Sequence, residues 1–154
     1  MFSIILYEPE IPPNTGNIIR LCANTGTNLH LFEPLGFELD EPRLKRAGLD
    51  YREFADVSVH TDLQTCLAVL DNPRVFALST RATTNYSSAT FEPGDAFLFG
   101  PETRGLPQTL LESLPYKQRL RLPMQPDSRS LNLSNAAAIV VYEAWRQQNH
   151  AGGT

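Results

Sequence analysis

The chain has 154 residues, 42% hydrophobic and 19% charged, with a formal net charge of −4 at pH 7. This length and balance predict one globular domain over residues 1–154 and exclude a disordered chain. The acidic charge argues against indiscriminate binding of nucleic acid. Local basic patches still allow binding at a specific site.

Strands and helices alternate along the chain. Short apolar runs bounded by Pro, Gly, Asn or Asp predict strands over residues 2–7, 28–32, 74–78, 96–99 and 118–122. Helices are predicted between and after them, over residues 15–23, 43–48, 62–70, 108–114 and 135–148. This order predicts an α/β fold with a mostly parallel sheet and helices on both faces. In such sheets ligands bind at the carboxyl ends of the strands.

The last predicted helix is apolar nearly all round, from Ala136 to Tyr142 and at Trp145. One sheet face cannot bury all of these side chains, so we expect a homodimer formed through this C-terminal helix. A tightly packed monomer is the alternative. Residues 149–154 are expected to be a frayed tail.

The amino-terminal segment and the cysteines indicate where in the cell the protein is expected. The apolar start, residues 1–7, is short and meets Glu8 and Glu10 at once, so it predicts a strand and not a signal peptide. No apolar run approaches the roughly 20 residues of a membrane helix. Cys22 and Cys66 lie far apart in sequence and are expected to be buried, reduced thiols. We therefore expect a cytoplasmic protein with no membrane partner.

Three loops rich in Gly, Asn, Ser or Pro indicate a composite ligand site. They are residues 14–20, 99–106 and 126–135. The third enters the last helix with Ser130, Asn132, Ser134 and Asn135, whose side chains suit a helix N-terminus with outward N–H groups. An ordinary capped helix is the alternative for that loop alone.

Several other chemistries are not expected. Gly100 and Gly105 have the spacing of a phosphate loop, but Leu106 and Pro107 follow where Lys and Ser or Thr should stand. The sequence contains no G-x-S-x-G motif, so a serine hydrolase is not expected. The three histidines lie in a predicted strand (His30), a strand-to-helix turn (His60) and the tail (His150), without metal-ligand spacing. We therefore expect no metal.

The motifs together resemble the SPOUT ribose 2′-O-methyltransferases. The matching segments are Asn-x-Gly-Asn-Ile-x-Arg at 14–20, Phe-Gly-Pro-Glu-x-x-Gly-Leu at 99–106, and Leu-Pro-Met with Ser-Leu-Asn-Leu-Ser-Asn within 122–135. The likeness covers residues 1–148 and is strongest to the single-domain members that methylate the wobble nucleotide, cytidine or uridine 34, of tRNA.

This resemblance implies a C-terminal trefoil knot, a homodimer, S-adenosylmethionine as cofactor and S-adenosylhomocysteine as product. Carried over by motif, the cofactor-binding residues are Leu78, Gly100, Leu122 and Ser130, with Met124 and Leu131 nearby. Glycine allows close approach of the backbone, and the apolar side chains offer a bed for uncharged adenine.

Arg20 is the residue most expected to act in catalysis, with Arg129 and Tyr142 on the substrate side. A guanidinium is a poor base, so Arg20 is interpreted as a donor that orients the substrate phosphate or ribose. Tyr142 could equally belong to the core. Glu102 is expected to brace the second loop. The tRNA would be held by the dimer, with arginines of one subunit serving the other subunit's site.

Other functions stay open on the residues alone. A related enzyme could methylate another tRNA position or ribosomal RNA, because the motifs report cofactor and ribose and not base sequence. A non-catalytic RNA-binding or cofactor-binding module is a second alternative, and a plain doubly wound nucleotide-binding protein is a third.

Overall fold

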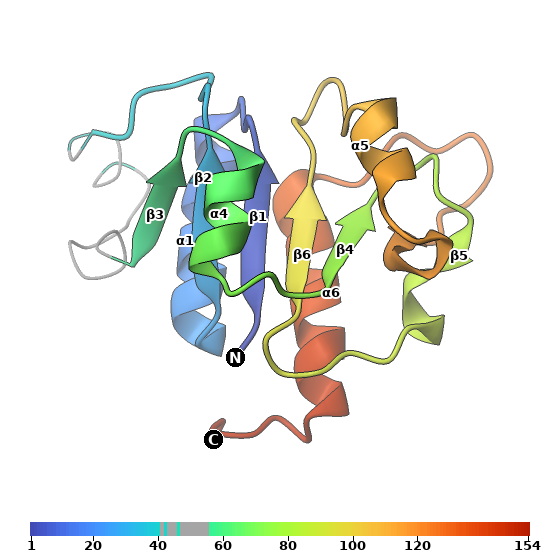
Figure 1. Ribbon diagram of the computed structural model, residues 1–154. Coiled ribbons are helices and arrows are strands. Elements are labelled where there is room, and N and C mark those ends of the chain that lie inside the picture. Colours follow the sequence, from blue (N-terminus) through green and yellow to red (C-terminus); the bar gives the residue numbers. More distant parts are fainter. Residues whose placement is uncertain (41, 43–45, 47–55) are drawn as a thin grey trace.

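The computed structural model describes residues 1–40, 42, 46 and 56–154. One seven-stranded sheet, ordered β3-β2-β1-β6-β4-β7-β5, has helices on both faces (Figure 1). The strands are β1 (Ser3–Tyr7), β2 (Asn28–Phe32), β3 (Val57–His60), β4 (Val75–Leu78), β5 (Thr84–Asn85), β6 (Ala96–Phe99) and β7 (Arg119–Arg121). The helices are α1 (Pro12–Thr25), α4 (Leu63–Val69), α5 (Gln108–Ser113) and α6 (Leu133–Gln147), with 3-10 turns η1 (Tyr86–Ser88) and η2 (Tyr116–Gln118). All pairings among these strands are parallel, so the predicted fold class is confirmed.

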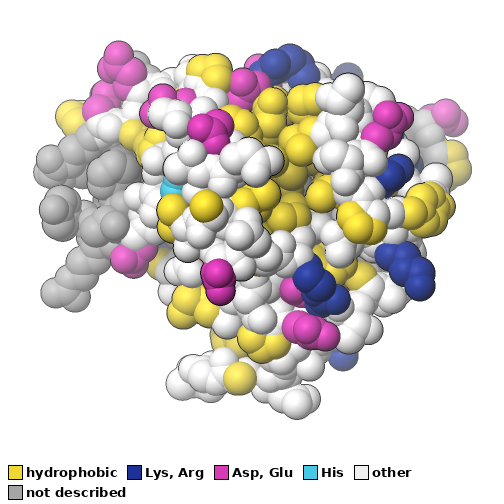
Figure 2. All heavy atoms as spheres, in the orientation of Figure 1, with side chains coloured by type: hydrophobic (Ala, Val, Ile, Leu, Met, Phe, Trp, Pro, Cys, Tyr) yellow, Lys and Arg dark blue, Asp and Glu magenta, His cyan; other side chains and the backbone are white. Residues whose placement is uncertain are grey.

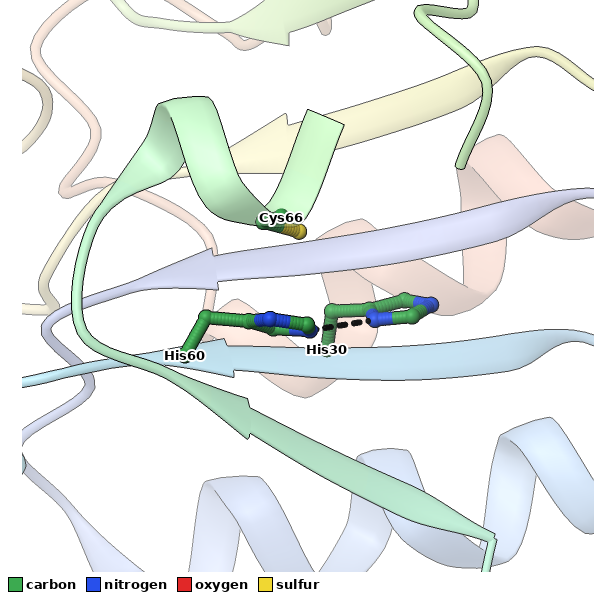
Figure 3. A group of neighbouring side chains, drawn as sticks. All are labelled: His30, His60 and Cys66. Atoms are coloured by element: carbon green, nitrogen blue, oxygen red, sulfur yellow. Dashed lines mark hydrogen bonds between the residues drawn. The ribbon is translucent and has the colours of Figure 1, made fainter. Parts of the chain in front are cut away.

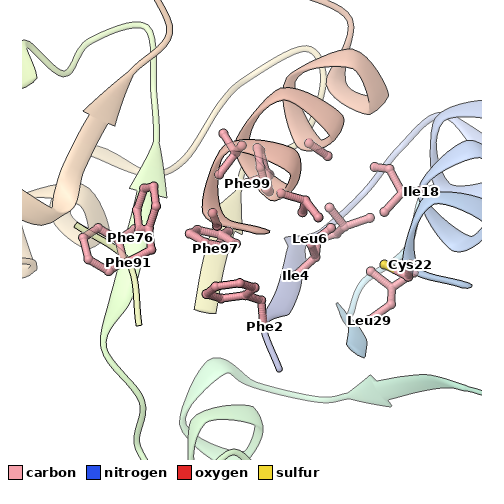
Figure 4. Close-up of a cluster of buried hydrophobic side chains, with 14 of the residues drawn as sticks. Phe2, Ile4, Leu6, Ile18, Cys22, Leu29, Phe76, Phe91, Phe97 and Phe99 are labelled. Carbon is pink, nitrogen blue, oxygen red and sulfur yellow. The ribbon is translucent and has the colours of Figure 1, made fainter. Parts of the chain in front are cut away.

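The central strands are buried on both faces, and their side chains alternate between two cores. In β6, Phe97 and Phe99 belong to the core that includes residues of α1 and α6, whereas Ala96 and Leu98 belong to the core that includes residues of α4 and α5. Figure 4 shows the first of these cores, with Phe76 and Phe91 beside Phe97. Burial on both faces explains why these strands form continuous apolar runs in the sequence.

The core on the α4 and α5 face is partly open to solvent. Both helices on it are short, and Tyr7, Leu63, Leu67, Leu110 and Leu114 pack there while only partly buried. Figure 2 shows hydrophobic side chains gathered in the middle of this face.

The helix ends follow local sequence signals. Helix α1 begins at Pro12, three residues before the predicted start, because proline needs no N–H partner in a first turn. It ends at Gly26, which has the left-handed φ of 67° typical of a helix C-cap. Helix α4 is capped by Asp62, the first residue of the predicted range, whose carboxylate accepts a hydrogen bond from the Thr65 N–H at 2.7 Å.

The two edge strands, β3 and β5, were not predicted from the sequence. Neither has a buried apolar run, since β3 is half exposed and β5 has only two residues. As a result His60, expected in a turn, is instead the last residue of β3. The helix predicted over residues 43–48 lies almost entirely outside the described residues.

Helix α6 is buried along one side only. Ala137, Val140, Val141 and Ala144 are fully enclosed, whereas Ile139 is 38% and Tyr142 45% exposed. In this single chain Tyr142 is therefore not a core residue. These exposed side chains agree with the reasoning behind the homodimer, which stays a prediction.

The chain beyond α6 is more ordered than the frayed tail that was expected. The indole N–H of Trp145 donates to the carbonyl of Ala151 at 3.0 Å, and the His150 ring contacts the Trp145 ring. Both cysteines are buried and unbridged, as predicted. Within the described parts of the chain, no helix is long and apolar enough to cross a membrane.

Asp95 is a buried carboxylate that fixes the start of β6. It is 3% exposed, and its oxygens accept from Arg74 Nε at 2.9 Å, Arg74 Nη2 at 2.6 Å and the Glu92 N–H at 2.7 Å. The hydrogen bond to Asp95 raises the pKa of Arg74. We expect Asp95→Asn to lower the free energy of unfolding by about 2 kcal/mol in urea denaturation, because part of a buried, paired network is lost.

Glu92→Gln is the matched control for Asp95→Asn. The Glu92 carboxylate lies 4.0 Å from Arg74 and is 70% exposed, so its loss should change stability by less than about 0.5 kcal/mol. Equal losses for the two variants would contradict the structural role of Asp95.

Candidate functional site

A cavity of about 450 Å³ opens at the carboxyl ends of three adjacent strands, β6, β4 and β7. Leu78 ends β4, Phe99 ends β6, and Leu122 follows β7 directly. Segments 100–105 and 130–133 also line the cavity, together with Ile11 before α1 and Asn14 in α1. The three sequence motifs thus meet at one place, where the topology of a parallel sheet predicts a ligand site.

Gly100 has no room for a side chain. A Cβ on this residue would lie 2.3 Å from the Leu106 nitrogen and 2.4 Å from the Gly105 carbonyl carbon, both backbone atoms. The loop folds back because the Gly105 N–H donates to the Pro101 carbonyl at 2.9 Å, with Gly105 at a φ of 68°. The second motif is therefore a compact turn whose backbone forms part of the cavity wall.

Two carboxylates connect the segment before α1 to the second loop by reciprocal hydrogen bonds. Glu102 accepts from the backbone N–H of Glu10 at 2.8 Å and of Ile11 at 3.2 Å. Glu10 in turn accepts from the N–H and the hydroxyl of Thr103, at 3.0 and 2.8 Å. The hydrogen bonds from Thr103 lower the pKa of Glu10. The expected bracing role of Glu102 agrees with this geometry, through backbone contacts and not through an arginine.

We expect Glu102→Ala to lower the free energy of unfolding by about 1.5 kcal/mol, because two charge-assisted hydrogen bonds to the start of α1 are lost. Glu102→Gln, which keeps one acceptor oxygen, should lose less. Urea denaturation measures both. Glu112→Ala is the control, since that exposed carboxylate accepts from the Gln108 side chain of the same short helix, at 2.9 Å. A Glu102→Ala loss no larger than the control's would show that the reciprocal contacts do not stabilise the loops.

Asn132 joins the third motif to the first. Its side-chain N–H donates to the Asn14 side-chain oxygen at 2.8 Å. Its oxygen accepts from the N–H groups of Ser134 at 2.9 Å and Asn135 at 3.4 Å, so Asn132 is the N-cap of α6. Of the capping candidates named from the sequence, Asn132 takes this position, and α6 begins two residues earlier than predicted.

The structure brings all six residues predicted to bind a cofactor into one cavity lining. They are Leu78, Gly100, Leu122, Met124, Ser130 and Leu131. The three residues predicted to act on the substrate are placed differently: Arg20 on α1, Arg129 in the last loop and Tyr142 on α6 are all exposed, and none is among the residues that line the cavity. Their functional roles stay predictions.

The sequence reasoning missed the segment after β4. Ser79, Thr80 and Arg81 line the cavity, and Arg81 donates to the Leu106 carbonyl and, at 2.6 Å, to the Gln108 side chain. This segment has no motif. The available signal was its position directly after a buried strand, since every such loop in a parallel sheet reaches the same edge.

Known proteins share these features. A model of the SpoU rRNA Methylase family matches residues 1–142. The tRNA (cytidine(34)-2′-O)-methyltransferase of Methylovorus glucosotrophus strain SIP3-4 is 59% identical over 152 residues, which are 99% of each chain. A solved structure concerned with "the 2-OH methylation of C/U34 on tRNA" has a TM-score of 0.88 at 46% identity and covers 97% of each chain.

A more distant neighbour contains a ligand. The SpoU methyltransferase AviRb from Streptomyces viridochromogenes, solved in complex with the cofactor AdoMet, has a TM-score of 0.82 at 21% identity. It covers 99% of this chain and 58% of its own. At that identity the likeness concerns the fold.

The sheet, the flanking helices and the cavity at the strand ends define an α/β protein of the methyltransferase type, consistent with the α/β knot fold. The match over residues 1–142 makes the assignment specific. The chain belongs to the SpoU rRNA methylase family. The resemblance found in the three motifs is thereby confirmed.

Proposed function

We propose that this protein transfers a methyl group from S-adenosylmethionine to the ribose 2′-hydroxyl of nucleotide 34, the wobble position of tRNA. The observation that carries the proposal is the meeting of all three motifs around one cavity at the strand ends. The relative at 59% identity, named for this reaction at cytidine 34, supports the choice of substrate.

The residues present suit this cofactor. A cavity of about 450 Å³ is in the range of small-molecule sites. Leu78, Leu122 and Met124 offer apolar contacts for an uncharged purine, while Ser130 supplies a hydroxyl. Gly100 places backbone at the wall where a side chain would not fit. Bound there, S-adenosylmethionine supplies an electrophilic methyl group.

The reaction is a direct displacement, and the protein's main task is alignment. A bond forms between the ribose 2′-oxygen and the methyl carbon, the carbon–sulfur bond breaks, and S-adenosylhomocysteine leaves. The hydroxyl proton passes to solvent or to a neighbouring group. Arg20 orients the substrate through its phosphate or ribose, since a guanidinium remains charged and can donate several hydrogen bonds.

The tRNA substrate is held by a homodimer that pairs through α6. Ile139 and Tyr142 on that helix are 38% and 45% exposed in the single chain, so a second subunit would cover them. Arg20 and Arg129 do not line the cavity of their own chain, which supports a site in which one subunit's arginines serve the other subunit's cofactor. Such local arginines also explain how an acidic chain binds RNA.

The proposal is tested by methyl transfer from labelled S-adenosylmethionine to total tRNA from a strain that lacks the protein, followed by nucleoside mapping. We expect a labelled 2′-O-methyl nucleoside at position 34. Label at another tRNA position, or only in ribosomal RNA, would contradict the proposed target. No transfer to either RNA would favour the non-catalytic module.

A further inference from the structure

Two histidines and a cysteine, distant in sequence, meet on the α4 side of the sheet, away from the cavity (Figure 3). His30 lies in β2, His60 ends the adjacent edge strand β3, and Cys66 lies in α4, which packs against both strands. His30 Nδ1 and His60 Nε2 are 2.9 Å apart, and the two rings stack with centroids separated by 5.1 Å. One ligand atom from each of the three residues lies within 4.8 Å of the others.

The cluster is enclosed and incompletely hydrogen-bonded. His30 is 5% exposed and Cys66 is completely buried, while His60 is half-buried. His30 Nε2 has no hydrogen-bond partner among the described residues. That nitrogen lies on the far side of the ring, and the His30 atom that faces the cluster is Nδ1, opposite His60 Nε2.

We propose that His30, His60 and Cys66 form a binding site for a borderline to soft metal ion, represented by Zn²⁺. Two imidazoles and a thiolate are a donor set that zinc prefers. Around a tetrahedral zinc, with bonds of about 2.0–2.3 Å, donor atoms lie roughly 3.3–3.7 Å apart. In the present cluster the facing nitrogens are 2.9 Å apart and one donor from each residue lies within 4.8 Å of the others, so metal binding requires the histidine pair to exchange its mutual hydrogen bond for two bonds to the ion.

Binding requires unprotonated donors. A neutral imidazole retains a lone pair on one ring nitrogen, and the metal binds that form of each histidine. The metal displaces the Cys66 thiol proton to solvent as the metal–sulfur bond forms. Three protein donors leave the fourth position for a water molecule.

This site is separate from the proposed methyl transfer. None of the three residues lines the cavity at the strand ends. A metal here would join β2, β3 and α4 and so hold the edge strand β3 to the sheet. We therefore expect it to stabilise the fold and to leave methyl transfer unchanged.

The test titrates the purified, metal-free full chain with Zn²⁺ by calorimetry, and with Co²⁺ as a spectroscopic probe. We expect one equivalent per chain, a thiolate-to-cobalt charge-transfer absorption, and a higher melting temperature with Zn²⁺. Cys66→Ala should abolish the absorption, and His60→Gln should weaken zinc binding at least tenfold. Cys22→Ala, at the other buried thiol, and His150→Gln, at the third histidine, should bind like the parent chain.

The proposal is overturned if the parent chain binds no stoichiometric metal, or if Cys66→Ala and His60→Gln bind as tightly as the controls. His60 is only half-buried, so His60→Gln is expected to fold and decides the matter even if the Cys66 variant does not. Circular dichroism without metal establishes folding for each variant.

Discussion

Arg20→Ala is expected to reduce methyl transfer at least a hundredfold while leaving cofactor binding and the fold intact. Arg20 is exposed on α1 and does not line the cavity, so its removal should not alter the cofactor's contacts. Alanine also suits a helix at least as well as arginine. What is lost is alignment of the substrate, and small misplacements of reacting groups cost about 10²-fold in rate. Single-turnover transfer to tRNA measures the effect, and calorimetry with S-adenosylhomocysteine measures binding.

Two further variants sharpen this experiment. Arg20→Lys keeps the charge but not the planar pair of donors, so we expect an intermediate rate. Lys117→Ala is the control, because Lys117 is an exposed cation in η2 that lies neither on α1 nor on α6 and does not line the cavity. If Arg20→Ala lost cofactor binding, its assignment to the substrate side would be wrong.

Gly100→Ala is expected to destabilise the protein by about 3 kcal/mol and to abolish cofactor binding. The added Cβ would overlap the backbone of Gly105 and Leu106, which cannot swing aside as the end of a flexible side chain can. The loop must open, and its backbone then leaves the cavity wall. Urea denaturation and calorimetry with S-adenosylhomocysteine measure the two effects.

Gly26→Ala separates this steric effect from ordinary loss of a glycine. A Cβ at Gly26 would meet nothing within 4 Å, although its φ of 67° disfavours alanine. We expect a cost of about 1 kcal/mol and unchanged cofactor affinity. Normal cofactor binding by Gly100→Ala would refute the close approach assigned to this residue.

The sequence was most informative where burial dictates the residue type. The central strands carry apolar runs because both of their faces are covered, and those strands were predicted to within a residue or two. The edge strands β3 and β5 carry no such run, since water replaces one neighbour and one face. Hydrophobic pattern alone therefore underestimates the width of this sheet.

The residues of the candidate sites also fall into those that the sequence predicted and those that it did not. The six predicted cavity residues were found by carry-over from the resemblance to the SPOUT methyltransferases, and only Gly100 among them also has a backbone reason, its close approach to Gly105 and Leu106. Arg81 was missed because it contacts the second loop mainly through its own side chain, in a segment without glycine or proline. The His30, His60 and Cys66 cluster was missed because its spacing of 30 and 6 residues acquires meaning only when β3 lies beside β2.

The cavity draws its walls from residue 11 to residue 136, across nearly the whole length of the chain. During synthesis from the amino terminus, β1, α1 and β2 can pair while this pocket still lacks most of its walls. Only when the segment before α6 has left the ribosome and Asn132 has reached Asn14 are all three motifs in place. A nascent chain therefore has no complete cofactor site to guide its early folding, and the methyl donor can stabilise only an almost finished molecule.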